Sequence, residues 1–180
     1  MEEQVDIINE HDEVIGSVPR SQMRRERLPH RASYIVVQNR EGRYLIEVRT
    51  LNKDYAPGLL DACVGGVVQS GEDPLLSARR ELAEEIGVSV DDPKMEFKFL
   101  GTMRIDYPKH HPRSFLFAYL FIAKGDAITV RQREEVSGIM YLTATDVARL
   151  EHNFTTDSVT AFNETIRRVD AADKVESQEA

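Results

Sequence analysis

The sequence predicts one mixed α/β (α+β) domain in which helices sandwich mixed β-sheets. The chain has 180 residues, 41% of them hydrophobic, which is the length and apolar content of a single globular domain. Short runs of β-branched and aromatic residues alternate with a few segments of helical periodicity, and this order is typical of sheets covered by helices. The sequence has no internal repeat and no low-complexity linker.

An N-terminal extension is expected over residues 1–31. Two short apolar runs, 5–8 and 14–18, flank a polar segment and predict a β-hairpin. Pro19 then opens a basic stretch over residues 20–27, which predicts one short helix. We favour an exposed helix face whose arginines pair with nearby acids. The alternative is that these arginines attract a phosphorylated substrate.

The main domain is expected over residues 32–169. It begins with two strand-like runs, 32–38 and 44–48, around the turn sequence Asn-Arg-Glu-Gly, and these predict a second hairpin. After a loop with a Pro-Gly pair, an apolar run predicts a further strand over residues 62–68, interrupted by two glycines.

The clearest helix follows this strand. Asp73 is placed to cap its first turn, and Pro74 suits the first helical position. Gly87 is a natural stop for the helix. Between them, apolar residues recur at helical spacing: Leu75, Ala78, Leu82 and Ile86.

The C-terminal half is expected to add strands over residues 97–102, 115–122 and 136–142, and helices over residues 145–150 and 156–169. The polar segment 104–113 is a candidate contact for a base or sugar, with a plain surface loop as the equal alternative. Residues 170–180 are small, polar and acidic, and we expect a disordered tail there.

Composition and charge exclude several functions. The chain carries 31 acids and 23 bases, a formal charge of −8 at pH 7, which argues against a nucleic-acid binder. The longest apolar run, 115–123, is far shorter than the ~20 residues that a membrane helix needs. The single cysteine, Cys63, is expected to be a small buried residue and suits a reducing compartment. Because the chain opens on acidic residues and not on a secretory leader, we expect a cytoplasmic protein.

Carboxylates are concentrated on the predicted helix that ends at Gly87. Glu81, Glu84 and Glu85 fall within an arc of roughly 100° on one helical face. Like charges at this spacing repel each other, and Arg80 can offset only part of the repulsion. A hard divalent cation such as Mg²⁺, which prefers carboxylate oxygens, would offset the rest. A solvated acidic helix face is the alternative.

Residues 66–88 resemble the Nudix box, Gly-x5-Glu-x7-Arg-Glu-U-x-Glu-Glu-x-Gly-U, in which U is an aliphatic residue. Every specified position is satisfied, a match expected by chance with a probability on the order of 10⁻⁸ at ~6% usage per residue type. The resemblance implies a Nudix fold and a hydrolase that depends on Mg²⁺, with Mn²⁺ as a substitute. Such an enzyme cleaves the diphosphate bond of a nucleoside diphosphate derivative, or of a related organic diphosphate, by water attack on phosphorus.

The resemblance also assigns roles to individual residues. Glu81, Glu84 and Glu85 correspond to metal-binding carboxylates, and the last two also to catalytic, water-activating residues. Arg80 corresponds to the arginine that orients a box glutamate, and Gly66 to a loop position that bends the chain and contacts the substrate.

Two acids outside the box fall in a loop where many Nudix enzymes place an extra carboxylate. They are Glu134 and Glu135, and Glu135 is a candidate catalytic residue. The alternative is that both are solvated loop charges.

Residues before the box resemble type I isopentenyl-diphosphate isomerase, which shares the Nudix fold. Arg49 and Lys53 correspond to basic residues that hold the diphosphate. His30 corresponds to a metal-binding histidine, but we favour a structural or supporting role for it because the partner histidine is missing. The remaining histidines, the cysteine and the paired glutamates of the isomerase fall on or near other residue types: Met23, Gly65, Val67, Ser114 and Leu116.

The resemblance therefore favours a hydrolase from the isomerase-like side of the superfamily. An isomerase of the isopentenyl-diphosphate type is one alternative, and a non-catalytic, ligand-sensing Nudix domain is the other. The expected partner is a small-molecule diphosphate, with no nucleic acid and no membrane. The oligomeric state is open, with a homodimer among the options.

Overall fold

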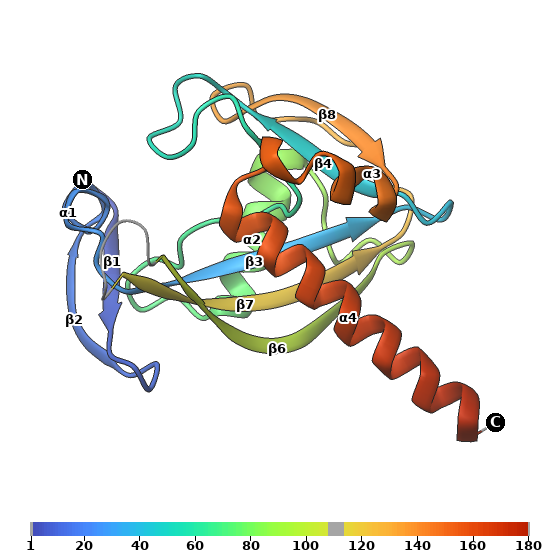
Figure 1. Ribbon diagram of the computed structural model, residues 1–180. Helices are drawn as coiled ribbons and strands as arrows, with labels where there is room; N and C mark the ends of the chain where they lie inside the picture. Colours follow the sequence, from blue (N-terminus) through green and yellow to red (C-terminus); the bar gives the residue numbers. More distant parts are fainter. Residues whose placement is uncertain (1, 108–113, 180) are drawn as a thin grey trace.

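A mixed sheet occupies the centre of the computed structural model, which describes residues 2–107 and 114–179 (Figure 1). Six strands of the described residues form it: β3 (His30–Gln38), β4 (Tyr44–Arg49), β5 (Leu60–Asp61), β6 (Glu96–Asp106), β7 (Phe115–Lys124) and β8 (Val136–Leu142). The order is β5-β4-β3-β7-β6, and β8 pairs with the other edge of β4. The expected strands in the C-terminal half are confirmed, and β6 extends to Asp106. Segment 104–113 is therefore partly strand, and its residues 108–113 lie outside the described part of the chain.

The two strands of the second hairpin diverge after their turn. Their ladder contains only the pair Gln38 and Tyr44. Beyond this pair β3 runs parallel to β7, whereas β4 runs antiparallel to β8. The predicted turn is confirmed, but each strand finds its main partner elsewhere in the chain.

The expected strand over residues 62–68 is wrong as a regular element. Only the short β5 precedes it, and the rest of the segment meets β3 through isolated bridges at Val64 and Val67. The physical cause is Gly65, whose φ of +145° lies outside the strand region. Its amide donates to the carboxylate of Glu85 over 3.2 Å and not to a neighbouring strand.

Helices cover both faces of the central strand β3, which confirms the predicted sandwich. Ile35 and Val37 pack with α2 (Pro74–Ile86) in one hydrophobic cluster. Tyr34 and Val36 lie in a second cluster with α4 (Thr156–Glu179). Alternate side chains of a strand point to opposite faces, so β3 contributes to both cores. The short α3 (Ala144–Arg149) and a 3₁₀ turn, Glu151–Asn153, lead into α4.

The C-terminal helix is longer than expected. The structure continues α4 through residues 170–179, where the sequence predicts a disordered tail. This stretch contains alanines, lysine and glutamates, which are good helix formers and can prolong a helix that the core has already nucleated. No helix in the described residues is long and apolar enough to cross a membrane.

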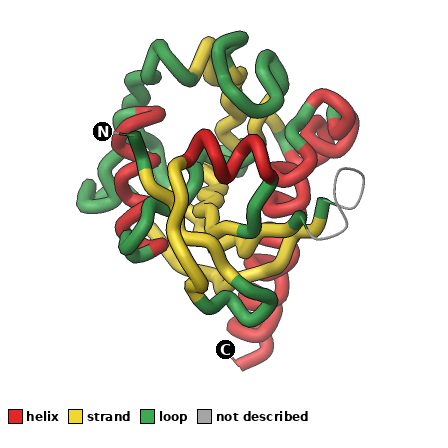
Figure 2. The backbone as a smooth tube through the Cα atoms, turned by 90° about the vertical axis from the view of Figure 1, so that its left-hand side faces the viewer, coloured by secondary structure: helices red, strands yellow, loops and turns green. Residues whose placement is uncertain are grey.

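The N-terminal extension forms the predicted hairpin, β1 (Gln4–Ile8) and β2 (Val14–Pro19), and the predicted helix α1 (Arg20–Glu26). Figure 2 views the molecule from this side, with the hairpin in front of the central sheet. Met23 anchors the unit, because it is fully buried in a cluster with Val67 of the glycine-rich segment. Asp6 accepts hydrogen bonds from Ser70 Oγ at 2.6 Å and from the Gly71 amide at 3.0 Å. The extension is thus attached to the loop that leads into α2.

Candidate active site

Local sequence signals determine both ends of α2. Asp73 caps its start by accepting a hydrogen bond from the Leu75 amide at 2.8 Å, and Pro74 occupies the first turn. Gly87 ends the helix in the left-handed conformation, with φ of +67°. Because Leu82 and Ile86 are fully buried, the helix is held in one rotation about its axis. The predicted extent of this helix is confirmed.

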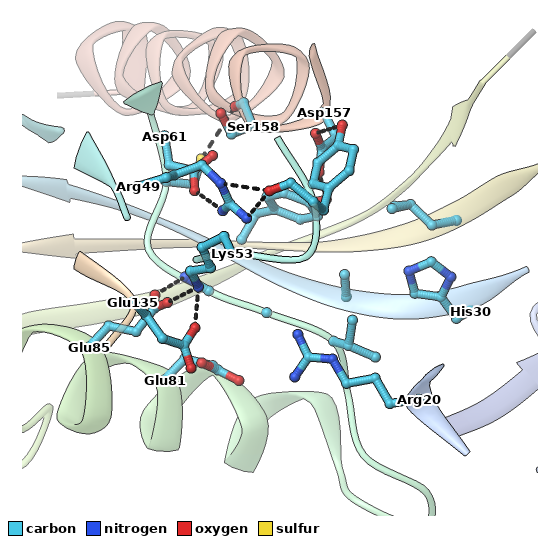
Figure 3. A pocket seen from close by; sticks show the side chains of 18 of the residues that line it. Arg20, His30, Arg49, Lys53, Asp61, Glu81, Glu85, Glu135, Asp157 and Ser158 are labelled. Carbon is cyan, nitrogen blue, oxygen red and sulfur yellow. Dashed lines mark hydrogen bonds and ion pairs between the residues drawn. The ribbon is translucent and has the colours of Figure 1, made fainter. Parts of the chain in front are cut away.

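A pocket of about 160 Å³ lies beside the C-terminal half of α2 (Figure 3). Its walls come from α1, the loop over residues 50–58, the glycine-rich segment, the Glu135 loop and the first turn of α4. All eight predicted site residues line this pocket. They are Arg49, Lys53, Gly66, Arg80, Glu81, Glu84, Glu85 and Glu135. The fold therefore brings together residues that are as many as 86 positions apart (from Arg49 to Glu135).

Arg80 holds three carboxylates in place. Its Nε and Nη2 atoms donate to the two oxygens of Glu72 at 2.9 and 3.1 Å. Its Nη1 atom lies 2.9 Å from Glu81 Oε1 and 3.0 Å from Glu84 Oε2. A guanidinium can form such a fork because its donors are planar and fixed. Arg80 therefore orients the box glutamates, which is the geometry that its assigned role requires.

Lys53 connects α2 to the Glu135 loop. Its Nζ atom donates to Glu85 Oε1 at 3.2 Å and also forms an ion pair with Glu135. Thr50 positions the loop, because its Oγ1 donates to the Glu134 carbonyl at 2.8 Å and its amide to the Glu135 carbonyl at 3.0 Å. The structure therefore places Glu135, and not Glu134, against the α2 carboxylates.

Gly66 brings the backbone against Glu81. A Cβ atom at this position would lie 2.7 Å from Glu81 Oε1, which is closer than real Cβ contacts allow. A larger residue would therefore displace the Glu81 carboxylate, and glycine lets the loop approach it this closely. The structure places Gly66 beside the carboxylates.

Two carboxylates of α2 are largely withdrawn from water. The side chains of Glu81 and Glu85 are 12% and 4% exposed, whereas that of Glu84 is 54% exposed. Burial and the charge of Glu85 raise the pKa of Glu81 to about 8. Burial also raises the pKa of Glu85 to about 7, although Lys53 and the Gly65 amide act in the opposite direction. Excess negative charge in a dry site produces such shifts.

The donor set fits a hard divalent cation. Among the described residues, five carboxylates pair with Arg80 and Lys53, and these acids are Glu72, Glu81, Glu84, Glu85 and Glu135. Within residues 2–107 and 114–179, no three potential metal ligands converge on one point. Several of the carboxylate oxygens instead pair with Arg80 or Lys53. Buried oxygen ligands with surplus charge match the preference of Mg²⁺ and Mn²⁺.

The guanidinium group of Arg49 is occupied by contacts within the protein and is not open to an anion. Its Nε atom donates to the carbonyls of Tyr55 and Ala56, both at 3.1 Å, and its Nη2 atom to the Tyr55 carbonyl at 2.6 Å. Its Nη1 atom pairs with Asp61, and the side chain is only 11% exposed. The structure thus gives Arg49 the task of holding the loop that carries Lys53. Of the two predicted diphosphate contacts, Lys53 is the one beside the carboxylates.

Sequence reasoning missed Glu47 on β4. This side chain is 3% exposed, and its Oε1 atom has no hydrogen-bond partner in the described part of the chain. Burial and the charges of Glu85 and Asp61 raise its pKa well above the usual range. A lone charge within the apolar run 44–48 was the available signal.

Sequence reasoning also missed Asp157 at the start of α4. It accepts hydrogen bonds from the hydroxyls of Tyr34 at 2.6 Å and Tyr55 at 2.8 Å. These groups form the wall of the pocket opposite α2. No local pattern reveals this cluster, because Asp157 is more than 100 residues away from each of the two tyrosines.

His30 and Cys63 line the pocket without charge. His30 is buried, its Nδ1 atom lies 2.8 Å from the Leu28 carbonyl, and burial with the nearby Arg24 lowers its pKa to about 4. Cys63 is buried as expected, and burial raises the pKa of its thiol well above the ordinary value. Both side chains are therefore neutral near pH 7.

Comparison with known proteins yields consistent matches. The family model described as the NUDIX domain matches residues 28–162. The uncharacterized Nudix hydrolase YfcD of Shigella flexneri is 36% identical over 184 residues, covering 99% of this chain and 94% of the relative. Its counterpart in Salmonella typhi is 41% identical over 160 residues, covering 89% and 83%.

Solved structures share the fold. The crystal structure of DR0079 from Deinococcus radiodurans has a TM-score of 0.69 and 28% identity, covering 85% of this chain and 91% of that one. The NUDIX domain of Shewanella oneidensis NrtR, solved with ADP ribose, has a TM-score of 0.61 and 17% identity, covering 77% and 87%. At that identity the second likeness concerns the fold alone.

Proposed function

The chain belongs to the Nudix hydrolase family, and from this premise we propose that it hydrolyses a diphosphate bond with Mg²⁺, or with Mn²⁺ as a substitute. The proposed substrate is a nucleoside diphosphate derivative or a related organic diphosphate. We also propose the isomerase-like branch of the family, because of Arg49, Lys53 and the N-terminal extension. A cytoplasmic location is proposed from the single cysteine.

One observation carries the proposal, namely the surplus of buried carboxylates at a glycine loop. Glu81 and Glu85 are largely buried, and Gly66 lies against the first of them. Such a cluster costs stability unless a cation enters it. Proteins retain costly clusters of this kind mainly at functional sites.

The residues of the chain divide the work of catalysis. Glu81, Glu84 and Glu85 would hold the metal, and Arg80 keeps two of them oriented. A bound Mg²⁺ ion would withdraw charge from the phosphate oxygens and favour attack on phosphorus. Glu84 and Glu135 have the most exposed side chains of the cluster, 54% and 37%, so water reaches them and one of them can accept its proton. Lys53 can donate to a phosphate oxygen, because its ammonium lies among these acids.

The proposed reaction is tested by phosphate release. Wild-type protein is screened with Mg²⁺ and with Mn²⁺ against nucleotide sugars, dinucleotides, coenzyme A, nucleoside triphosphates and isoprenoid diphosphates. Glu84→Gln and Glu85→Gln should each lower turnover by at least 100-fold, since each removes a metal-holding or proton-accepting oxygen. Glu41→Gln is the matched control, because Glu41 is 78% exposed and lies outside the pocket. Near-normal turnover of both α2 variants would overturn the mechanism.

Isomerisation is not proposed. Met23 and Val67, two positions at which the isomerase carries acid–base or metal-binding side chains, belong to one hydrophobic cluster. Product analysis with isopentenyl diphosphate checks this conclusion, and we expect no isomer.

A further inference from the structure

The arginines of α1 divide into two groups. Arg25 faces solvent, is 67% exposed and pairs with Glu26, as the exposed-face interpretation expects. Arg20 and Arg24 lie one turn apart and instead line the active-site pocket, with side chains 31% and 29% exposed. The expected pairing with nearby acids is present for both residues, through Glu3 and Asp54, but the two side chains line the pocket instead of a fully exposed helix face.

Both pocket-facing guanidinium groups keep unused donors. Arg20 donates from Nη1 to Glu3 at 2.9 Å. The Nε atoms of Arg20 and Arg24 lie 4.0 and 3.7 Å from Asp54 Oδ2, within ion-pair distance but beyond hydrogen-bond distance. Within the described residues, the Nε atoms of both arginines are buried and have no hydrogen-bond partner. Buried donors without partners are costly, and a bound anion can satisfy the guanidinium groups that carry them.

The two arginines share their pocket with the carboxylates of α2. Figure 3 shows Arg20 and His30 towards one side of the pocket, and Glu81, Glu85 and Glu135 towards the other. Burial tends to lower the pKa of Arg20, but Glu3, Asp54 and Glu135 together raise it. Because Arg20, Arg24 and the α2 carboxylates line one pocket, a substrate held at the carboxylates can extend towards α1.

We propose that Arg20 and Arg24 form an anion subsite that binds the free terminal phosphate of the substrate hydrolysed at α2. This inference rests on the proposed function and narrows its substrate class. A free terminal phosphate carries about 1.5 to 2 negative charges near pH 7, which two arginines match. A phosphate capped by a sugar carries only one. The preferred class is thus an organic diphosphate or triphosphate with an uncapped end.

The first test measures binding of inorganic phosphate to the metal-free protein by isothermal titration calorimetry. Arg20→Gln and Arg24→Gln should each weaken binding roughly tenfold, because each removes a charge-assisted hydrogen bond. Arg25→Gln, on the same helix, should leave binding unchanged. Arg24→Lys keeps the charge and should retain part of the affinity. Thermal unfolding identifies any variant that fails to fold, and Arg24→Lys then carries the comparison against Arg25→Lys. Equal phosphate binding by wild type and the folded pocket variants would overturn the subsite.

The second test compares kcat/KM for ADP, whose terminal phosphate is free, with that for ADP-ribose, in which it is capped. The Arg20→Gln/Arg24→Gln double variant should lower kcat/KM at least tenfold more for ADP than for ADP-ribose. Equal losses for the two substrates would overturn the subsite. If wild type binds phosphate through the two arginines but hydrolyses no diphosphate, the subsite stands and the proposed hydrolase function fails.

Discussion

Replacing Glu81 by glutamine should make the metal-free protein more stable while it removes activity. Glu81 is 12% exposed, and burial together with Glu85 raises its pKa from 4.5 to about 8. A carboxylate whose pKa is higher in the folded state binds a proton on folding at pH values between the two pKa values. The free energy of unfolding therefore falls as the pH rises through this range.

The size of the effect follows from the pKa. At about 1.4 kcal/mol per unit, Glu81 alone should lower the free energy of unfolding by roughly 2–3 kcal/mol between pH 6 and pH 8.5. Glutamine has a similar shape and no charge, so the Glu81→Gln variant should lose this contribution. The wild type and the Glu81→Gln variant both keep the smaller pH-dependent decrease in the free energy of unfolding that is due to Glu85, whose pKa is about 7.

The assay is urea unfolding in metal-free buffer at pH 6 and pH 8.5, followed by circular dichroism. At pH 8.5 the Glu81→Gln variant should exceed the wild type by at least about 2 kcal/mol. Glu84→Gln is the matched control on the same helix, since its side chain is 54% exposed, and it should keep the pH dependence of the wild type. An equal loss of stability with pH in wild type and Glu81→Gln would refute the reasoning.

Three further predictions test the site. Gly66→Ala places a Cβ atom 2.7 Å from Glu81 Oε1 and should lower turnover at least tenfold, while the free energy of unfolding changes by about 1 kcal/mol or less. A normal kcat would show that this contact does not matter for catalysis. Arg49→Gln breaks the buried ion pair with Asp61 and the hydrogen bonds to Tyr55. Urea titration should show that it lowers the free energy of unfolding by about 3 kcal/mol. A loss below about 1 kcal/mol would rule out the structural role of Arg49. The affinity for Mn²⁺, measured by electron paramagnetic resonance, should rise at least tenfold from pH 6 to pH 8. Metal ligands must be deprotonated, and the pKa values of Glu81 and Glu85 are about 8 and 7.

The parts of the fold that local chemistry determines could be predicted from the sequence. The ends of α2 follow from Asp73 and Gly87, whose capping needs only neighbouring amides. Strands rich in β-branched and aromatic residues could also be predicted, because these residue types favour extended backbone locally. The strand expected over residues 62–68 failed because Gly65 turns its amide to Glu85, a residue 20 positions away.

Residue geometry alone could predict the site only where its residues are close in the sequence, whereas Arg49, Lys53 and Glu135 were predicted from the family resemblance. Glu81, Glu84 and Glu85 share a helical face, so their convergence follows from helix geometry. The contact of Lys53 with Glu135 spans 82 positions, and it depends on how two loops pack. The direction of Arg20 and Arg24 was likewise hidden, because a seven-residue helix acquires its orientation from the burial of Met23.

The central claim is that water attacks phosphorus at the carboxylates of α2, and it is tested most directly in ¹⁸O-labelled water. The wild type, given Mg²⁺ and an accepted diphosphate substrate, should incorporate one ¹⁸O atom into one phosphate product, as mass spectrometry detects. Glu85→Gln should lower the rate of this incorporation at least 100-fold while its circular dichroism spectrum stays that of the wild type. Products free of ¹⁸O, or an equal rate of labelling by the variant, would contradict the account.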